Sequence, residues 1–309
     1  MIGGVEKMKV GVIMGGTSSE KQVSIMTGKE MVTQLDKQKY EVAAIILDDN
    51  KEVIDKVREI DVALLALHGK FGEDGTIQGV LETLGIPYTG SGLLASGLCM
   101  DKNMAKKILR YEGVATPDWI HLIKGEELPL QDIELIGYPL VVKPNAGGSS
   151  VGVKIIHDRS ALLTAVAEIF KWDNEIIIEQ YLIGDEITCP ILNDKLLPVL
   201  SIKHTAVFFD YQAKYDDAST IEEPVELPLA IHDRVAKAAM TSYKSLKCNV
   251  YARVDMLIKE GVPYVLEVNT LPGMTQNSLL PKSALAAGIS YSALLDSIIE
   301  SSIQIDRNK

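Results

Sequence analysis

Four polar residues in the last quarter of the chain are spaced so that they can share one face of a β-hairpin. Residues 251–273 read YARVDMLIKEGVPYVLEVNTLPG, and the flanks of a turn centred on Gly261 alternate with period two. A hairpin that is symmetric about this glycine sets the polar side chains in two facing pairs, Arg253 with Asn269 and Asp255 with Glu267. The other face is then expected to be apolar and to carry Val254, Met256, Ile258, Tyr264, Leu266 and Val268.

This polar face has the chemistry of a cation site. Two carboxylates that face each other across antiparallel strands lie roughly 5 Å apart, which is unfavourable unless something positive lies between them. The side chains of Asp255, Glu267 and Asn269 are hard oxygen ligands, which suit magnesium shared with the phosphates of a nucleotide. A solvated hairpin face is the plainer alternative. Both carboxylates, however, lie within apolar runs, and the loop 270–273 follows directly, which favours a ligand site.

The first ninety residues alternate between short apolar strands and helical segments. The predicted strands are 9–14, 40–47 and 62–67, and the predicted helices are 23–35 and 53–58. This order is typical of a parallel, doubly wound sheet, in which ligands lie beyond the carboxyl ends of the strands. The loops 15–20 and 68–76 are therefore expected to line one crevice. Neither is a dinucleotide fingerprint or a P-loop, and tight turns, with His68 satisfied by the backbone, are the alternative.

A glycine-serine loop in the middle of the chain is a second candidate ligand site. A strand at 138–144 contains Lys143 next to its end, the loop 145–152 reads NAGGSSVG, and a strand follows at 153–157. The backbone N–H groups of such a loop can turn toward phosphate, with Lys143 nearby as a point charge. A flexible hairpin loop is an equally good interpretation.

The remaining elements follow from periodicity. Helices are predicted at 93–111, which carries Lys102, at 161–172, at 230–246 and, after a Ser290 cap, at 291–299, and a strand is predicted at 175–182. Residues 203–228 have neither period. Because a loop of this length inside a compact domain usually has a function, we expect it to form a lid over a site.

Composition excludes several classes of function. The chain has 309 residues and a net charge of −11, which allows two or three packed subdomains and disfavours nucleic acid or anionic membranes as partners. Its three cysteines are widely spaced without a CxxC motif, so neither a disulfide nor a structural zinc is expected, and a reducing cytoplasm fits. No apolar run has the length of a membrane span. Small molecules are the expected partners.

Five parts of the chain carry specific motifs. They are GGTSSEKQVS at 15–24, LHGKFGEDG at 67–75, GGSSVG at 147–152, FDYQAKY at 209–215, and RVDM at 253–256 with EVNTLPGMT at 267–275. Together they resemble the D-alanine–D-alanine ligases of the ATP-grasp superfamily, and the match extends from Lys9 to the last helix. The resemblance implies an α/β protein with an ATP-grasp fold preceded by a Rossmann-like parallel domain. The three implied subdomains are 1–93, 94–181 and 182–309.

The resemblance also implies the reaction and the nucleotide site. In that family the carboxylate of D-alanine attacks the γ-phosphate of ATP, and the amine of a second D-alanine displaces phosphate from the acyl phosphate. Two Mg²⁺ or Mn²⁺ ions would be held by Asp255, Glu267 and Asn269. Lys214 would reach the γ-phosphate from the lid. The other implied nucleotide-binding residues are Lys102, Lys143, Ser149 and Ser150 near the phosphates, Glu179, Gln180, Tyr181 and Leu182 near the adenine, and Glu186 at the ribose.

The amino-acid sites are implied in the same way. Glu20 and His68 match the residues that bind the first D-alanine, while Ser278 and Leu279 match the site of the second. Arg253 and the backbone N–H of Gly273 resemble the donors that stabilise the tetrahedral intermediate. A hydrogen-bonded triad of Glu20, Ser149 and Tyr215 would join the three subdomains, and relatives are commonly homodimers.

Two alternatives differ from this interpretation. One is an ATP-grasp ligase with another nucleophile, such as D-lactate or D-serine. Tyr215 argues against D-lactate, because the depsipeptide-forming relatives tend to carry phenylalanine there. The other is a nucleotide-binding protein without turnover, which Arg253 disfavours because binding alone would not need it.

Overall fold

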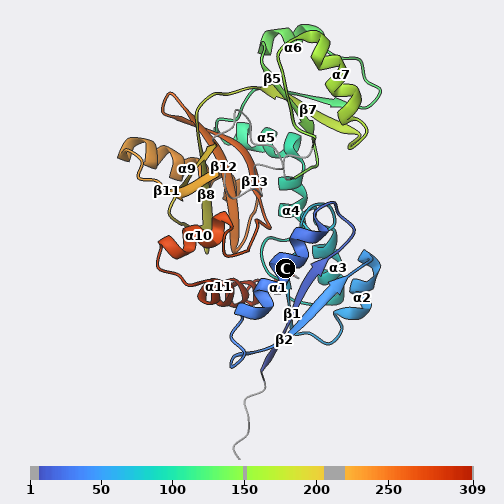
Figure 1. The fold of residues 1–309 in the computed structure, drawn as a ribbon, viewed down its shortest axis with the longest axis vertical. Coiled ribbons are helices and arrows are strands. Elements are labelled where there is room, and N and C mark those ends of the chain that lie inside the picture. Colours follow the sequence, from blue (N-terminus) through green and yellow to red (C-terminus); the bar gives the residue numbers. More distant parts are fainter. Residues whose placement is uncertain (1–6, 149–151, 205–219, 308–309) are drawn as a thin grey trace, which may run out of the picture.

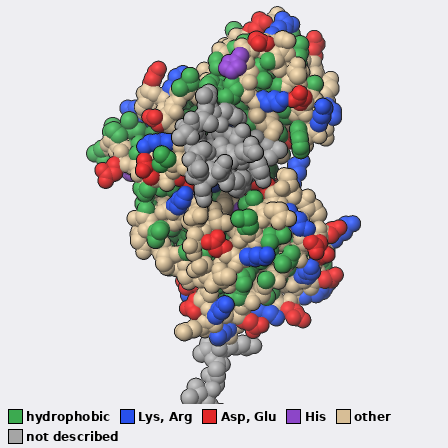
Figure 2. Space-filling view, viewed as in Figure 1, with side chains coloured by type: hydrophobic (Ala, Val, Ile, Leu, Met, Phe, Trp, Pro, Cys, Tyr) green, Lys and Arg blue, Asp and Glu red, His purple; other side chains and the backbone are tan. Residues whose placement is uncertain are grey.

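A computed structural model describes residues 7–148, 152–204 and 220–307, with only the backbone of His204 described. This part of the chain contains three β-sheets (Figure 1). Acidic and basic side chains are interspersed over the face seen in Figure 2. Within the described residues, no helix combines the length and hydropathy that a membrane crossing requires.

The first sheet is parallel and has the strand order β2-β1-β3. Its strands are β1 (Met8–Gly15), β2 (Tyr40–Leu47) and β3 (Val62–Leu65), and its helices are α1 (Lys21–Gln34), α2 (Val53–Lys56) after the 3-10 turn η1 (Asn50–Glu52), and α3 (Thr76–Leu84). The side chains of β3 are all buried, as expected for a strand covered on both faces. The prediction of a parallel α/β sheet is confirmed.

The second sheet is antiparallel and has the order β4-β7-β5-β6. Its elements are β4 (Trp119–Ile123), α6 (Leu130–Ile136), β5 (Leu140–Pro144), β6 (Lys154–Ile156), α7 (Arg159–Ile169) and β7 (Glu175–Gln180). The helices α6 and α7 enclose a small core with the apolar residues of β5 and β7, which forms the upper lobe of Figure 1.

The third sheet is antiparallel and has the order β11-β10-β8-β12-β13, with β9 paired to β8. Its elements are β8 (Asp185–Leu192), β9 (Lys195–Leu196), β10 (Leu200–His204), β11 (Thr220–Pro224), β12 (Tyr251–Lys259) and β13 (Val262–Asn269), with the helices α9 (Leu229–Ser245) and α10 (Leu279–Ala286). The expectation that 203–228 lacks regular structure was wrong at both ends, because β10 and β11 pair there. Residues 205–219 lie outside the described part.

The predicted single helix at 93–111 is also wrong. The structure has two helices, α4 (Leu93–Met100) and α5 (Lys102–Tyr111). The side chain of Asp101 accepts a hydrogen bond from the N–H of Met104 at 2.9 Å, so this residue caps a new helix in the middle of a continuous apolar pattern. The cap sets the direction of Lys102, the first residue of α5.

The hairpin of β12 and β13 has the predicted polar pairs, with Arg253 opposite Asn269 and Asp255 opposite Glu267. Its turn is different, because Lys259 pairs with Val262 and the two residues between them have positive φ angles of 53° and 74°, as in a type I′ turn. A β-bulge reconciles the two registers: Met256 pairs with Val265 and the next pair is Asp255 with Glu267, which leaves one extra residue on β13.

That extra residue is Leu266, and it changes the predicted apolar face. The core takes Val265, which is fully buried, whereas Leu266 lines a cavity instead. The placement of Tyr264 and Leu266 in the core was therefore wrong. The other predicted core residues of this hairpin are buried, namely Val254, Met256, Ile258 and Val268.

The last helix, α11 (Tyr291–Ile303), returns to the N-terminal sheet and packs against β3 and α1. Its buried residues Leu294, Leu295 and Ile298 belong to the same core as β1. The predicted cap is confirmed, because the Ser290 hydroxyl accepts a hydrogen bond from the N–H of Ala293 at 3.3 Å. The two ends of the chain are therefore built into one core. The subdomain boundaries at 93 and 181 stay a prediction.

Candidate active site

A cavity of about 740 Å³ lies between the second and third sheets. Many predicted site residues line it together, although they come from six different elements and the loops between them. They are Lys102, Lys143, Glu179, Gln180, Tyr181, Leu182, Glu186, Arg253, Asp255, Glu267 and Leu279. Leu257 and Leu266 add an apolar wall. A concave, partly apolar site with a few convergent charges is typical of a small-molecule pocket.

Asp255 is the most strongly hydrogen-bonded carboxylate of the cavity. It accepts from Nε and Nη2 of Arg253 at 2.9 and 2.8 Å, from the Thr188 hydroxyl at 2.6 Å and from the Asn269 amide at 3.0 Å. Burial alone would lower the pKa of Arg253, but the charge of Asp255 raises it above its usual value. Arg253 is therefore a fixed cation, and it was predicted to face substrate rather than Asp255.

Glu267 faces Asp255 and is more accessible, with 30% of its side chain exposed. Its oxygens lie 3.4 Å from the Asn269 amide nitrogen and 3.9 Å from Nζ of Lys102. Positive or N–H groups thus surround both carboxylates, as expected where two acids face each other. The described residues contain no cluster of three or more His, Cys, Asp and Glu side chains. Two carboxylates and an amide still form a hard oxygen set that fits Mg²⁺ completed by phosphate oxygens.

Lys102 connects this acidic pair to the glycine loop. Its ammonium donates to the carbonyl of Gly147 at 2.5 Å and lies on the Glu267 side of the cavity. Burial lowers the pKa of the Lys102 ammonium, against the raising effect of Glu267. Asn145 fastens the start of α5 to the loop: its side-chain oxygen accepts from the N–H of Asn103 at 2.9 Å and its amide donates to Asp101 at 2.9 Å.

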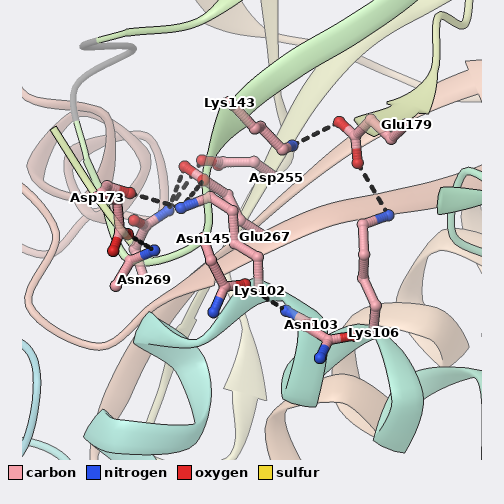
Figure 3. A network of polar contacts seen from close by, with 12 residues as sticks. Lys102, Asn103, Lys106, Lys143, Asn145, Asp173, Glu179, Asp255, Glu267 and Asn269 are labelled. Atoms are coloured by element: carbon pink, nitrogen blue, oxygen red, sulfur yellow. Dashed lines mark hydrogen bonds and ion pairs between the residues drawn. The ribbon is translucent and has the colours of Figure 1, made fainter. Parts of the chain in front are cut away.

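Glu179 lies between two lysines at the other end of the cavity (Figure 3). Lys143 donates to its Oε1 at 2.5 Å, and Nζ of Lys106 lies 3.0 Å from its Oε2. Burial would raise the pKa of Glu179, but the charges of Lys106 and Lys143 lower it below its usual value. Sequence reasoning missed Lys106. The available signal was its spacing, because it follows Lys102 by four residues and so shares one side of α5.

Glu20 borders a second cavity of about 540 Å³, which shares Pro144, Gly147 and Gly148 with the first. A Cβ atom at Gly69 would lie 2.8 Å from its carboxylate, and one at Gly148 would lie 3.3 Å away. Glu20 therefore lies beside the residue that precedes Ser149. The predicted residues Ser149, Ser150, Lys214 and Tyr215 lie outside the described part of the chain.

Three further predicted residues are close to the site without lining either cavity as described. His68 is buried, with Nε2 3.2 Å from the Thr27 hydroxyl and Nδ1 3.7 Å from Glu73. Gly273 lies against Ser278, since a Cβ atom there would be 3.0 Å from the serine oxygen. The structure thus gathers the predicted nucleotide and metal residues in one cavity and sets the predicted amino-acid residues around it.

Comparison with known proteins gives consistent matches along the whole chain. The family models described as D-ala D-ala ligase N-terminus and C-terminus match residues 9–56 and 48–91, and residues 108–300. A D-alanine–D-alanine ligase of Bacillus anthracis is 63% identical over 302 residues, covering 98% of this chain and 99% of that protein. One of Clostridium beijerinckii is 52% identical over 301 residues, covering 97% and 100%.

Solved structures agree with these matches. The crystal structure of the Bacillus anthracis ligase complexed with ATP has a TM-score of 0.89 at 60% identity, covering 96% of this chain and 98% of that chain. The VanG D-Ala:D-Ser ligase of Enterococcus faecalis has a TM-score of 0.85 at 30% identity, covering 96% and 100%.

Proposed function

The chain belongs to the D-alanine–D-alanine ligase family, and we propose that it joins two D-alanines with cleavage of ATP to ADP and phosphate, a step of peptidoglycan synthesis. The observation that carries this proposal is the shared cavity, in which Lys102 and Lys143 lie with the facing carboxylates of Asp255 and Glu267. The ATP complex of the relative that is 60% identical supports the nucleotide assignment. Phosphoryl transfer needs positioning and charge neutralisation more than covalent chemistry, and these residues supply both.

We assign the phosphates to Lys102 and Lys143, with Lys214, Ser149 and Ser150 as further contacts. Lys102 would exchange the Gly147 carbonyl for phosphate oxygen. Asp255, Glu267 and Asn269 would hold two Mg²⁺ or Mn²⁺ ions, which when bound neutralise charge on the phosphates.

At the other end of the cleft, Glu179 with the segment 180–182 would meet the adenine and Glu186 the ribose. This assignment puts the base where β7 ends and the phosphates near the acidic pair. The length of the cavity then matches the nucleotide, from base to γ-phosphate.

Arg253 and the N–H of Gly273 are assigned to the tetrahedral intermediate. Since Asp255 holds Nε and Nη2 of Arg253, its guanidinium plane is fixed before substrate arrives, and we assign the Nη1 edge to the developing oxyanion. Fixed donors are the most effective kind for such charge.

Glu20 and His68 are assigned to the first D-alanine, and Ser278 and Leu279 to the second. The position of Glu20 beside Gly148 supports the triad with Ser149 and Tyr215. We also propose that the protein is a cytoplasmic homodimer with no nucleic-acid or membrane partner.

The test is phosphate release measured with ATP, Mg²⁺ and a panel of D-amino and D-hydroxy acids, with mass spectrometry of the product. Release should require D-alanine, ATP and Mg²⁺ together and give D-alanyl-D-alanine. Phosphate release that is indifferent to D-alanine would contradict the proposal. Because a relative at 30% identity is named a D-Ala:D-Ser ligase, D-serine is the competitor to include. A mixed dipeptide as the main product would move the assignment to that class.

A further inference from the structure

Lys106 is a buried cation that the proposed reaction does not use. It lies on α5 one turn after Lys102, and only 1% of the residue is exposed. It does not line the cavity. Its ammonium donates to the Thr116 hydroxyl at 2.7 Å and to the Pro117 carbonyl at 3.1 Å, and it lies 3.0 Å from Oε2 of Glu179. All three of its protons thus have a direction.

Glu179 needs this second lysine when a nucleotide binds. Its Oε1 is held by Lys143, which lines the cavity and is assigned to phosphate. Phosphates that draw Lys143 away would leave Glu179 with the charge of Lys106, which approaches from behind (Figure 3). A carboxylate in a buried site without a counter-charge becomes protonated instead of staying ionised.

We propose that Lys106 is a positioning residue that keeps Glu179 an ionised, acceptor-only group and thereby makes the cleft select a 6-amino purine nucleotide over a 6-oxo purine nucleotide. The inference rests on the proposed contact between Glu179 and the adenine. An ionised carboxylate can only accept hydrogen bonds, whereas a protonated one can also donate. An amino group at position 6 therefore matches ionised Glu179, and a carbonyl oxygen there is repelled.

The electrostatics agree with this role. Burial lowers the pKa of Lys106 to about 8, against the raising effect of Glu179, so the ammonium is mainly protonated at neutral pH. The lowered pKa of Glu179 has both lysines among its causes. Arg110, which also lowers the pKa of Lys106, does not replace it, because its guanidinium pairs with Asp118 at 2.8 Å.

The experiment compares ATP with inosine triphosphate, which has a carbonyl at position 6, by measuring kcat/KM for each at saturating D-alanine and Mg²⁺. In Lys106→Met the preference for ATP should fall by about tenfold or more, as expected when a hydrogen bond to a charged group is lost. The change should lie mainly in the KM for ATP and little in the KM for D-alanine. The matched control is Arg110→Met, which removes a cation stacked 4.4 Å over the Trp119 ring that Lys106 also faces and should keep the wild-type preference.

A double-variant cycle separates this role from a structural one. Glu179→Gln should itself weaken the preference, and adding Lys106→Met to it should produce no further change if the lysine acts through the carboxylate. Independent, additive losses would overturn the inference. So would an unchanged preference in Lys106→Met together with a changed one in Glu179→Gln.

The outcomes also separate the inference from its premise. If Glu179→Gln keeps the wild-type preference, the proposed adenine contact fails and the inference fails with it, while the ligase reaction stands. Lys106→Gln is the second neutral variant, because its amide can still bond to Thr116. Failure of both neutral variants to fold, with Glu179→Gln folded, would assign Lys106 to the core and overturn the inference.

Discussion

The two facing carboxylates of the cavity are expected to respond very differently to neutralisation. Glu267→Gln should abolish most turnover with little change in stability, whereas Asp255→Asn should lower both. The reason is their surroundings. Asp255 accepts four hydrogen bonds, two of them from the buried Arg253, while Glu267 is 30% exposed and its nearest cation, Lys102, is 3.9 Å away.

The magnitudes follow from these contacts. Asp255→Asn leaves the guanidinium of Arg253 buried without its counter-charge, which costs about 3–5 kcal/mol, a large part of the roughly 5–15 kcal/mol of a typical domain. For Glu267→Gln the attraction to Lys102 is about 4 kcal/mol at an effective dielectric constant near 20. Desolvation and the repulsion from Asp255 oppose it, so the net change should stay within about 1 kcal/mol. Turnover should fall at least about a hundredfold, as when one electrostatic stabiliser is removed.

Urea unfolding with and without Mg²⁺ measures the stability of both variants, and phosphate release measures turnover. Mg²⁺ at a hundred times its dissociation constant should stabilise the wild type by about 2.7 kcal/mol and Glu267→Gln by much less. Near-normal turnover and an undiminished Mg²⁺ effect in Glu267→Gln would refute the metal assignment. A loss of stability in Glu267→Gln as large as that in Asp255→Asn would refute the account of their surroundings.

Three further predictions concern the neighbourhood of the site. Thr188→Val removes the buried 2.6 Å hydrogen bond to Asp255 and should lower the free energy of unfolding by about 1.5–3 kcal/mol; a loss below 0.5 kcal/mol in urea titrations, on the order of a surface change, would contradict it. Gly184→Ala puts a Cβ atom 2.4 Å from the Ile258 carbonyl oxygen, so we expect a loss of about 1–3 kcal/mol and a higher KM for ATP. An unchanged melting temperature would show that this approach is not tight. Because the pKa of Lys106 is lowered from 10.5 to about 8, the unfolded chain binds this proton between these pH values and the folded chain does not, so this lysine should make stability rise with pH there; comparing the wild type with Lys106→Met at pH 7 and pH 9 should give a difference of about 1 kcal/mol, and parallel curves would contradict the lowered pKa.

Sequence periodicity predicted what is regular in this protein. The apolar runs of β1 and β3 indicated buried parallel strands, and the alternation around Asp255 and Glu267 placed both pairs of the hairpin correctly. It failed where one residue interrupts a pattern. Asp101 ends one helix and caps the next without breaking the apolar spacing.

Contacts between distant segments were beyond the sequence for a different reason. Lys106 and Glu179 are 73 positions apart, and nothing local in either segment indicates that α5 passes behind β7. The roles implied by resemblance had no such limit, because each was attached to a position. They did not include the partner that holds Glu179 from outside the cavity.

The bulge at Leu266 gives the hairpin one residue of slack. Deleting that residue would leave a regular ladder in which Met256 still pairs with Val265 and Asp255 still pairs with Glu267. The chain can therefore shorten here without changing which acids face each other, although the cavity would lose an apolar wall. A one-residue length difference at this point is thus compatible with a working metal site, whereas the same deletion between Glu267 and Asn269 would separate the amide from its carboxylates.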